Sequence, residues 1–251
     1  MTGCIANRFP KRFGSTVDVG SSTVVVRILG PVRIPGLGRP LTSQQLSLVT
    51  RLAAVGPAGR ERLVDDLWDG RPVSAGRVAN VVAEVRSVLG PGRLPEARFG
   101  HYALQGVTTD LELLIAAAAE PPERGVGGDR LRLARLASVL DLVAGPILAT
   151  PGDRWWHWVD SHPELVARGE VAVARVTVEL ATGLVADGRL RPAQAACERA
   201  LAACPHDEQV LGVIEDVLRR QRRPGAADGV ARRRGRRLAR LDGLLADGGP
   251  A

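Results

Sequence analysis

Aromatic residues and lysine are scarce in this chain. Aromatic side chains make up 3% of the 251 residues, and Lys11 is the single lysine among 34 basic residues. Leucine, valine and alanine must therefore form the hydrophobic core, for which an apolar content of 45% is sufficient. The length favours two domains. Because the chain is also rich in alanine, glycine and proline, as GC-rich coding sequences dictate, its arginine content alone is no argument for a polyanionic partner.

Cysteines and long apolar runs are scarce as well. Cys4, Cys197 and Cys204 are too few and too scattered for a disulfide framework, and their odd number fits a reducing compartment. No run of about 18 apolar residues is present, which excludes a membrane-spanning helix on length. Cys4 is not preceded by the apolar core of a secretory or lipoprotein signal. We therefore expect a cytoplasmic protein with no membrane partner.

The sequence also lacks the common signatures of catalysis. It contains no GxxxxGKS phosphate loop, no GxSxG and no HExxH. His157 and His162 are five residues apart, a spacing that does not place two imidazoles on one helical face. Cys197 and Cys204 do not form a CxxC pair. The prediction is a protein that is not an enzyme, with no catalytic residues, no metal site and no cofactor.

Charge is distributed unevenly along the chain. Residues 22–107 carry 11 arginines and 6 acidic residues, a net charge of +5. Residues 108–218 carry 10 basic and 17 acidic residues, a net of −7, and residues 219–251 carry 10 arginines and 3 aspartates. A phosphate backbone would be attracted to the ends and repelled by the middle. The N-terminal part is therefore the better candidate for binding double-stranded DNA, and the acidic middle for contacting proteins.

Residues 59–104 predict a short helix, a turn, a longer helix and a hairpin centred on glycine. Arg60–Trp68 has an amphipathic helical pattern, and Asp69–Pro72 interrupts it. Ser74 can cap the next helix, whose apolar positions recur at helical spacing. These positions are Val78, Val81, Val82, Val85, Val88 and Leu89. The stretch Arg98–Leu104 then predicts strand, tight turn and strand.

The exposed face of the longer helix supplies the candidate DNA contacts. Opposite the valine stripe lie Arg77, Asn80, Glu84 and Ser87, with Arg86 on the flank. A helix held by one apolar stripe and presenting arginine and asparagine outward suits a DNA major groove. Arg98 and His101 in the hairpin are placed to enter the minor groove or hold phosphate. The candidate DNA-binding residues are thus Arg77, Asn80, Arg86, Ser87, Arg98 and His101; the alternatives are a solvated helix face and ordinary turn residues.

The remaining segments predict a mainly α chain with a small β component. Residues 1–21 are expected to be a disordered tail, and residues 23–29 and 32–34 strands of a small antiparallel sheet. Thr42–Gln45 is a capping box that opens a helix. After residue 108 helices dominate, in paired segments typical of tetratricopeptide-like repeats. The expected helices are 109–119, 129–143, 163–186, 191–203, 207–222 and 227–246.

Two features of the helical part leave alternatives open. Trp155 and Trp156 would point about 100° apart on a helix, so either one ring is an exposed contact anchor or both are buried between helices 129–143 and 163–186. The arginine run 219–240 is more simply a solvated face of a terminal helix than a second nucleic-acid site. It would equally suit docking onto the acidic middle of another copy of the chain.

In their order along the chain, these features resemble the Streptomyces antibiotic regulatory protein family, an OmpR/PhoB-type winged helix followed by a bacterial transcriptional activator domain. The resemblance covers about residues 23–246. It rests on Arg62–Trp68, Val85–Gly90 and Gly100–Leu104 in the first part, and on Leu142–Pro146, Trp155-Trp156 and Leu184–Ala203 in the second. It implies a winged helix-turn-helix domain over residues 22–107 and a helical tetratricopeptide-like domain over 108–251. Its implied function is transcription regulation through promoter DNA, with RNA polymerase or another regulator as protein partner.

One departure from that family supports an alternative function. Glu84 and Ser87 occupy positions where family members carry further basic residues, and a carboxylate facing phosphate is repelled, although Glu can accept a hydrogen bond from cytosine N4. The alternative is a protein-interaction scaffold whose winged helix is degenerate and no longer binds DNA specifically. In that case the acidic helical body would bind a basic partner helix or form a homo-oligomer.

Overall fold

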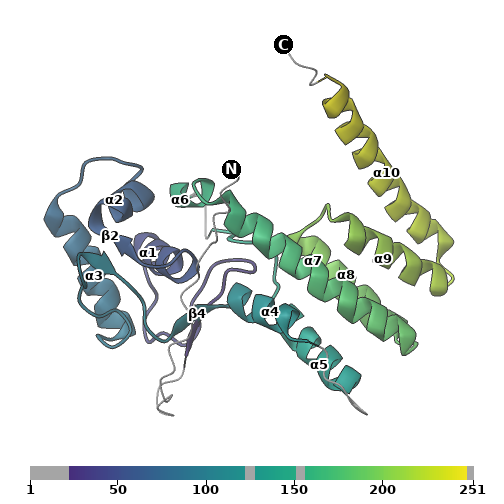
Figure 1. Cartoon of the computed structure of the whole chain (residues 1–251), viewed down its shortest axis with the longest axis horizontal. Coiled ribbons are helices and arrows are strands. Elements are labelled where there is room, and N and C mark those ends of the chain that lie inside the picture. The colour runs from purple at the N-terminus through teal and green to yellow at the C-terminus, as the bar shows by residue number, and fades with distance from the viewer. Residues whose placement is uncertain (1–22, 122–127, 151–155, 248–251) are drawn as a thin grey trace, which may run out of the picture.

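The computed structural model describes residues 23–121, 128–150 and 156–247, and it is mainly helical with few strands. Figure 1 shows α1–α3 at one end of the molecule and the C-terminal helices α9 and α10 at the other. The predicted tail 1–21 and Trp155 lie outside the described residues. The boundary expected between residues 107 and 108 falls inside a strand, β4, which leads directly into a helix.

The first part consists of short strands around three helices. In chain order they are β1 (Val24–Val26), α1 (Ser43–Ala54), β2 (Ala58–Gly59), α2 (Arg60–Trp68), α3 (Ala75–Leu89), β3 (His101–Tyr102) and β4 (Val107–Thr109). The predicted capping box at the start of α1 is present, because Gln45 N donates to Thr42 Oγ1 and Thr42 N donates to Gln45 Oε1. The predicted short helix, residues 60–68, is α2, and the predicted longer helix that Ser74 caps is α3.

The predicted antiparallel sheet of residues 23–29 and 32–34 is wrong. Those segments share only one antiparallel bridge, between Arg27 and Arg33. Instead, β1 pairs with β4 in parallel, with Val24 opposite Val107 and Val26 opposite Thr109. Pro31 has no N–H to donate, and the backbone of Val32 bonds to Ala149 O instead, so the ladder cannot continue. A parallel pair needs a long connection, which helices α1–α3 supply.

The second part is a series of helices joined by short turns. They are α4 (Asp110–Ala119), α5 (Gly128–Leu140), α6 (His157–Asp160), α7 (Pro163–Ala186), α8 (Leu190–Ala203), α9 (Glu208–Arg220) and α10 (Pro224–Asp247). The predicted helix 163–186 has the observed bounds of α7, because Pro163 suits the first helical turn and Gly188 follows its end with φ +72°. Each helix from α7 to α10 packs on the next along the chain.

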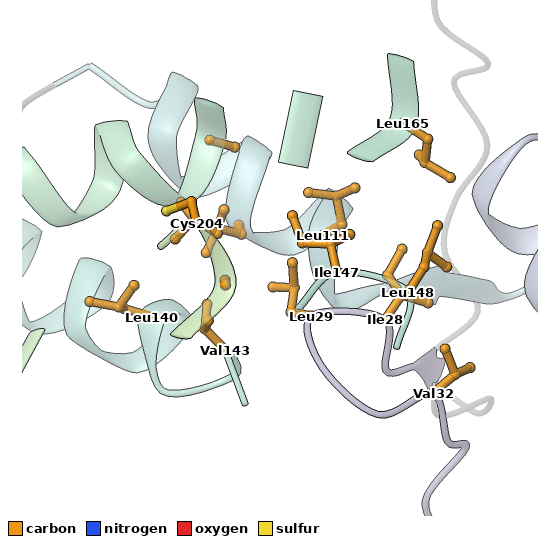
Figure 2. Packing of buried hydrophobic residues seen from close by; sticks show 14 of the residues in the cluster. Ile28, Leu29, Val32, Leu111, Leu140, Val143, Ile147, Leu148, Leu165 and Cys204 are labelled. Carbon is orange, nitrogen blue, oxygen red and sulfur yellow. The ribbon is translucent and has the colours of Figure 1, made fainter. Parts of the chain in front are cut away.

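The two parts share one hydrophobic core. The segment 28–32 lies along the segment 144–149, through hydrogen bonds from Leu148 N to Ile28 O (2.7 Å) and from Val32 N to Ala149 O (2.9 Å). Figure 2 shows Ile28 and Leu29 beside Leu111, Ile147 and Leu148, all of them buried. Gly30 makes this approach feasible, since its φ is +145° and a Cβ there would lie 2.9 Å from the Cβ of Ala144.

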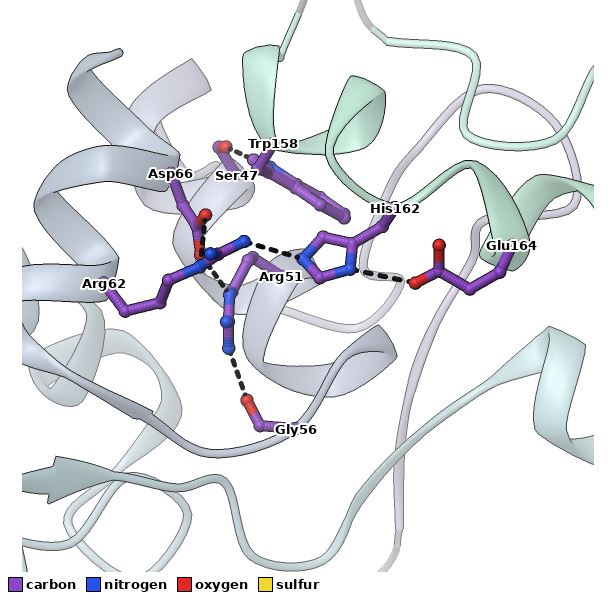
Figure 3. A network of polar contacts seen from close by, with 8 residues as sticks. All are labelled: Ser47, Arg51, Gly56, Arg62, Asp66, Trp158, His162 and Glu164. Carbon is purple, nitrogen blue, oxygen red and sulfur yellow. Dashed lines mark hydrogen bonds and ion pairs between the residues drawn. The ribbon is translucent and has the colours of Figure 1, made fainter. Parts of the chain in front are cut away.

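Polar side chains join the two parts at a second place, drawn in Figure 3. Arg51 Nε donates to Asp66 Oδ2 at 2.6 Å, and both side chains are buried. Arg62 Nε contacts the other oxygen of Asp66 at 3.0 Å and reaches His162 Nε2 through Nη2 at 3.3 Å. His162 Nδ1 in turn lies 3.0 Å from Glu164 Oε1. The network thus fixes α1 and α2 to the start of α7.

The tryptophans lie at this same junction. Trp158 donates through Nε1 to Ser47 Oγ on α1, and Trp156 stacks on Trp158 with ring centroids 6.0 Å apart. Trp156 is 5% exposed, so this ring is a core residue and not a contact anchor.

Candidate nucleic-acid interface

The longer helix of the first part, α3, is well defined at both ends. Ser74 Oγ accepts from Arg77 N at 3.3 Å, as the sequence predicted, and Gly90 follows the helix with φ +93°. The stripe of Val78, Val82, Val85 and Leu89 is buried, and α3 packs on α1. Burial of this stripe fixes which side of the helix remains exposed to solvent.

Arg77 and Asn80 lie on that exposed side. Both residues are exposed, and neither side chain has a hydrogen-bond or ion-pair partner within residues 23–121, 128–150 and 156–247. Leaving an arginine and an asparagine side chain unpaired on a rigid helix preserves their donors for a ligand. These groups can form bidentate hydrogen bonds to guanine and adenine edges.

The carboxylate of Glu84, on the same side of α3, has a hydrogen-bond partner within the protein. Its Oε2 accepts from Gln45 Nε2 at 2.5 Å, near the N-terminus of α1, where a negative charge is favourable. Arg39, from the loop before α1, donates through Nη2 to Ser87 Oγ at 3.0 Å, and Ser87 donates to the carbonyl of Glu84. Arg39 therefore places a positive charge beside this end of α3.

Arg86, a candidate contact, has bonds within the protein. Its Nε donates to Leu94 O at 2.8 Å and its Nη2 to Pro95 O at 3.1 Å, and the side chain is half-buried. These bonds tie the segment after α3 back onto the helix. The guanidinium therefore orients the hairpin that follows, and three of its five N–H donors remain for other partners.

The predicted strand before the turn is not present: the hairpin consists of a two-residue turn closed by one bridge, between Arg98 and His101. Arg98 and His101 exchange two backbone hydrogen bonds of 3.1 and 2.9 Å around Phe99 and Gly100, whose φ angles are +50° and +76°. Positive φ at both central residues is the geometry of a type I′ turn. His101 Nδ1 lies 3.0 Å from Phe99 O, and β3 pairs antiparallel with β2 beyond the turn. Arg98 and His101 are both exposed at this tip.

The arrangement brings the candidates together in two groups. Arg77, Asn80 and Ser87 share the exposed side of α3, while Arg98 and His101 flank the hairpin turn. The candidates from the sequence do not include two residues of this surface, Arg39 and Phe99. The proline and glycines around Arg39 predict a loop but not its contact with α3. Phe99 next to Gly100 does indicate the tip of a tight turn.

Two other features are absent from the part of the chain that the structure describes. No group of three or more metal-ligating side chains occurs among those residues. None of the helices there is both long enough and apolar enough to cross a membrane.

Neither the protein-family models nor the curated proteins contain a match to this chain. Among solved structures, the fold is similar to that of Mycobacterium tuberculosis EmbR in complex with a low-affinity phosphopeptide, with a TM-score of 0.62 and 25% sequence identity. The match covers 87% of this chain and 60% of the EmbR chain, so this chain spans less than two thirds of that protein. The likeness supports the architecture of the Streptomyces antibiotic regulatory protein type.

Proposed function

We propose that this chain is a transcription regulator that binds double-stranded DNA through α3 and the hairpin at residues 98–101, the two elements of a winged helix. The observation that carries the proposal is the pair Arg77 and Asn80, exposed and unpaired on a capped helix, together with the exposed Arg98 and His101 that flank the following two-residue turn. The structural similarity to EmbR, with the resemblance to the Streptomyces antibiotic regulatory protein family, supports a role in transcription regulation.

In this proposal the candidate residues have different tasks. Arg77 and Asn80 contact base edges in the major groove, and Arg98 and His101 contact phosphate or the adjacent minor groove. Ser87 holds the guanidinium of Arg39 beside the end of α3, and the remaining N–H donors of Arg39 contact phosphate there. Arg86 positions the hairpin through its two carbonyl bonds.

The helical part would contact a protein, RNA polymerase or another regulator, from a groove between α7 and the start of α9. The groove has a volume of about 1030 Å³ and is lined by Glu170, Glu179, Asp207 and Glu208 together with Arg175 and His206. Val171, 67% exposed, lies in the same groove. Acidic walls with an exposed apolar side chain fit a basic amphipathic segment. Such a segment of a second copy would make the protein a homo-oligomer.

Binding to duplexes with a randomised central segment, measured at low and moderate salt, tests DNA binding. Arg77→Ala should weaken binding about tenfold, since one good base contact is worth about 1–3 kcal/mol. The matched control is Arg168→Ala, which removes an exposed arginine from α7. Equal affinities of the two variants, or no salt-sensitive binding by the unaltered protein, would contradict the proposal. The second result would favour the scaffold function.

A further inference from the structure

Phe99 is exposed to an extent that no other described aromatic residue shares. Its relative exposure is 101%, so the ring touches nothing else in the protein. Trp156 and Trp158 are buried, and Trp68 and Tyr102 are half-buried against the core. In a chain so poor in aromatic residues, a ring held entirely in solvent gains nothing from folding.

The backbone at Phe99 makes this placement unfavourable for the free protein. A φ of +50° is a left-handed conformation that glycine, asparagine and aspartate adopt readily and a bulky aromatic residue does not. In two-residue hairpin turns the first central position is accordingly most often Asn, Asp or Gly. Retained strain of this kind is concentrated at functional sites. Phe99 therefore combines an unused apolar ring with an unfavourable backbone at one exposed tip.

We propose that Phe99 is a wedge that enters the minor groove of duplex DNA, stacks against a base pair and bends the duplex where the hairpin crosses it. This inference rests on the DNA binding proposed above and adds how the hairpin reads its site. Apolar side chains inserted between base steps kink DNA by partly unstacking them. Pyrimidine–purine steps unstack most easily, so the wedge would select sites by their deformability.

The surroundings of the ring favour DNA over a protein surface. The neighbours in the turn are Arg98 and His101, whose side chains can reach phosphates on either side of a groove. The other exposed large apolar side chains of the described chain are Val55, Leu113, Leu131 and Val171, and none belongs to the hairpin. A protein anchor normally sits within a patch that excludes water. A lone ring at the end of a two-residue turn is narrow enough to enter a groove.

Three forms of the full chain separate the ring from the turn. Phe99→Asn removes the ring but suits the left-handed backbone, so the hairpin should stay folded. Phe99→Trp keeps an aromatic ring of greater area. The third form is the unaltered protein. Each of the three would select DNA from duplexes with a randomised central segment, and the bound DNA would be sequenced. Energy transfer between dyes at the two ends of an enriched duplex then measures bending.

The unaltered protein and Phe99→Trp should enrich a pyrimidine–purine step at one fixed position of the selected duplexes. Their binding should also shorten the distance between the two ends of the duplex relative to free DNA. Phe99→Asn should lose both effects and about tenfold in affinity, while its thermal stability stays equal or rises. Equal selection and equal bending by Phe99→Asn would overturn the wedge and leave DNA binding by α3 intact. Absence of any DNA selection by the unaltered protein would overturn both.

Discussion

The indole Nε1 of Trp158 donates a hydrogen bond of 3.0 Å to Ser47 Oγ, joining two buried residues that are 111 positions apart. Ser47 lies on α1, beside the elements proposed to bind DNA, and Trp158 lies on α6, just before the helical series. The contact sits next to the network of Arg51, Asp66 and Arg62 (Figure 3). The part proposed to bind DNA is therefore not connected to the helical part by a linker alone, because side-chain and backbone hydrogen bonds join the two at several places.

The first prediction concerns cooperative unfolding. Ser47→Ala should lower the free energy of unfolding by about 1–3 kcal/mol, because the buried indole N–H of Trp158 would lose its acceptor.

Since the two parts share a core, urea should unfold both in one transition, with the same midpoint by tryptophan fluorescence and by circular dichroism. Two separate transitions in the unaltered protein would show that the parts are independent. The double variant Ser47→Ala/Trp158→Phe is the control. Trp158→Phe should lower the free energy of unfolding less in the Ser47→Ala protein than in the unaltered protein.

The second prediction concerns Asp110, whose side chain caps the backbone of the first part. Its Oδ1 accepts from Ile28 N at 2.8 Å, and both oxygens lie 3.3 Å from Leu29 N. Asp110→Ala would leave two buried N–H groups without acceptors and should cost about 2–4 kcal/mol. Asp110→Asn keeps one oxygen for Ile28 N and should cost less. Urea unfolding of the three forms measures these differences.

The pH dependence of the same three proteins checks the charge. Burial raises the pKa of the Asp110 carboxyl above its ordinary 3.8, although hydrogen bonds from Ile28 and Leu29 and the charge of Arg27 act to lower it. The folded protein then binds more protons than the unfolded chain between the two pKa values, so this carboxyl lowers stability as pH rises through that range. Asp110→Asn should remove that part of the slope. An unchanged slope would show that other groups produce it.

Local signals in the sequence were sufficient for most helices but not for the partners of the strands. Thr42, Ser74 and Pro163 mark helix starts through hydrogen bonds or backbone preferences within a few residues, which a linear pattern records. The pairing of β1 with β4 depends on a return of the chain after three helices. Val24–Val26 would satisfy either an antiparallel or a parallel neighbour equally well.

The candidate interface shows the same division. The valine stripe fixed which side of α3 is exposed, so Arg77 and Asn80 could be found from spacing alone. The bonds of Arg86 to Leu94 O and Pro95 O could not, because they depend on where the chain goes after Gly90. The sequence predicts that the charge of Glu84 repels phosphate, but it does not predict the contact of Glu84 with Gln45, because 39 residues separate the two.

The third prediction compares two arginines on α5. Arg132 is 8% exposed and donates to both carboxylate oxygens of Glu179, at 2.7 and 3.0 Å, and to Ala117 O. Those hydrogen bonds to Glu179 raise the pKa of Arg132 above its ordinary value. Arg132→Ala should lower the free energy of unfolding by about 2–4 kcal/mol, since Glu179 and a carbonyl lose a buried partner.

Its matched control is Arg135→Ala, one turn along the same helix. Arg135 pairs with Glu120 at the surface, where both side chains are about half exposed. Solvent screens that pair, so its loss should cost less than about 1 kcal/mol. Thermal or urea unfolding gives both values, and equal losses would show that the burial of Arg132 contributes nothing.

The fourth prediction concerns Glu84, the residue that most separates DNA binding from a degenerate scaffold. Glu84→Gln keeps an oxygen that can accept from Gln45 Nε2 and removes the negative charge one helical turn beyond Asn80. If DNA lies against this side of α3, its phosphates are repelled by that charge, and affinity should rise about threefold to fivefold at low salt. The gain should shrink as salt is added, because screening weakens the repulsion.

Glu198→Gln is the control for this charge change. Glu198 is an exposed residue of α8 that also accepts from a glutamine amide, Gln194 Nε2, at 2.7 Å. The two variants alter the net charge equally, so a gain confined to Glu84→Gln would place the duplex at α3. Equal gains would mean that only the net charge matters. Weaker binding by Glu84→Gln, with loss of preference among selected sequences, would instead show that the carboxylate accepts a hydrogen bond from a base, as it can from cytosine N4.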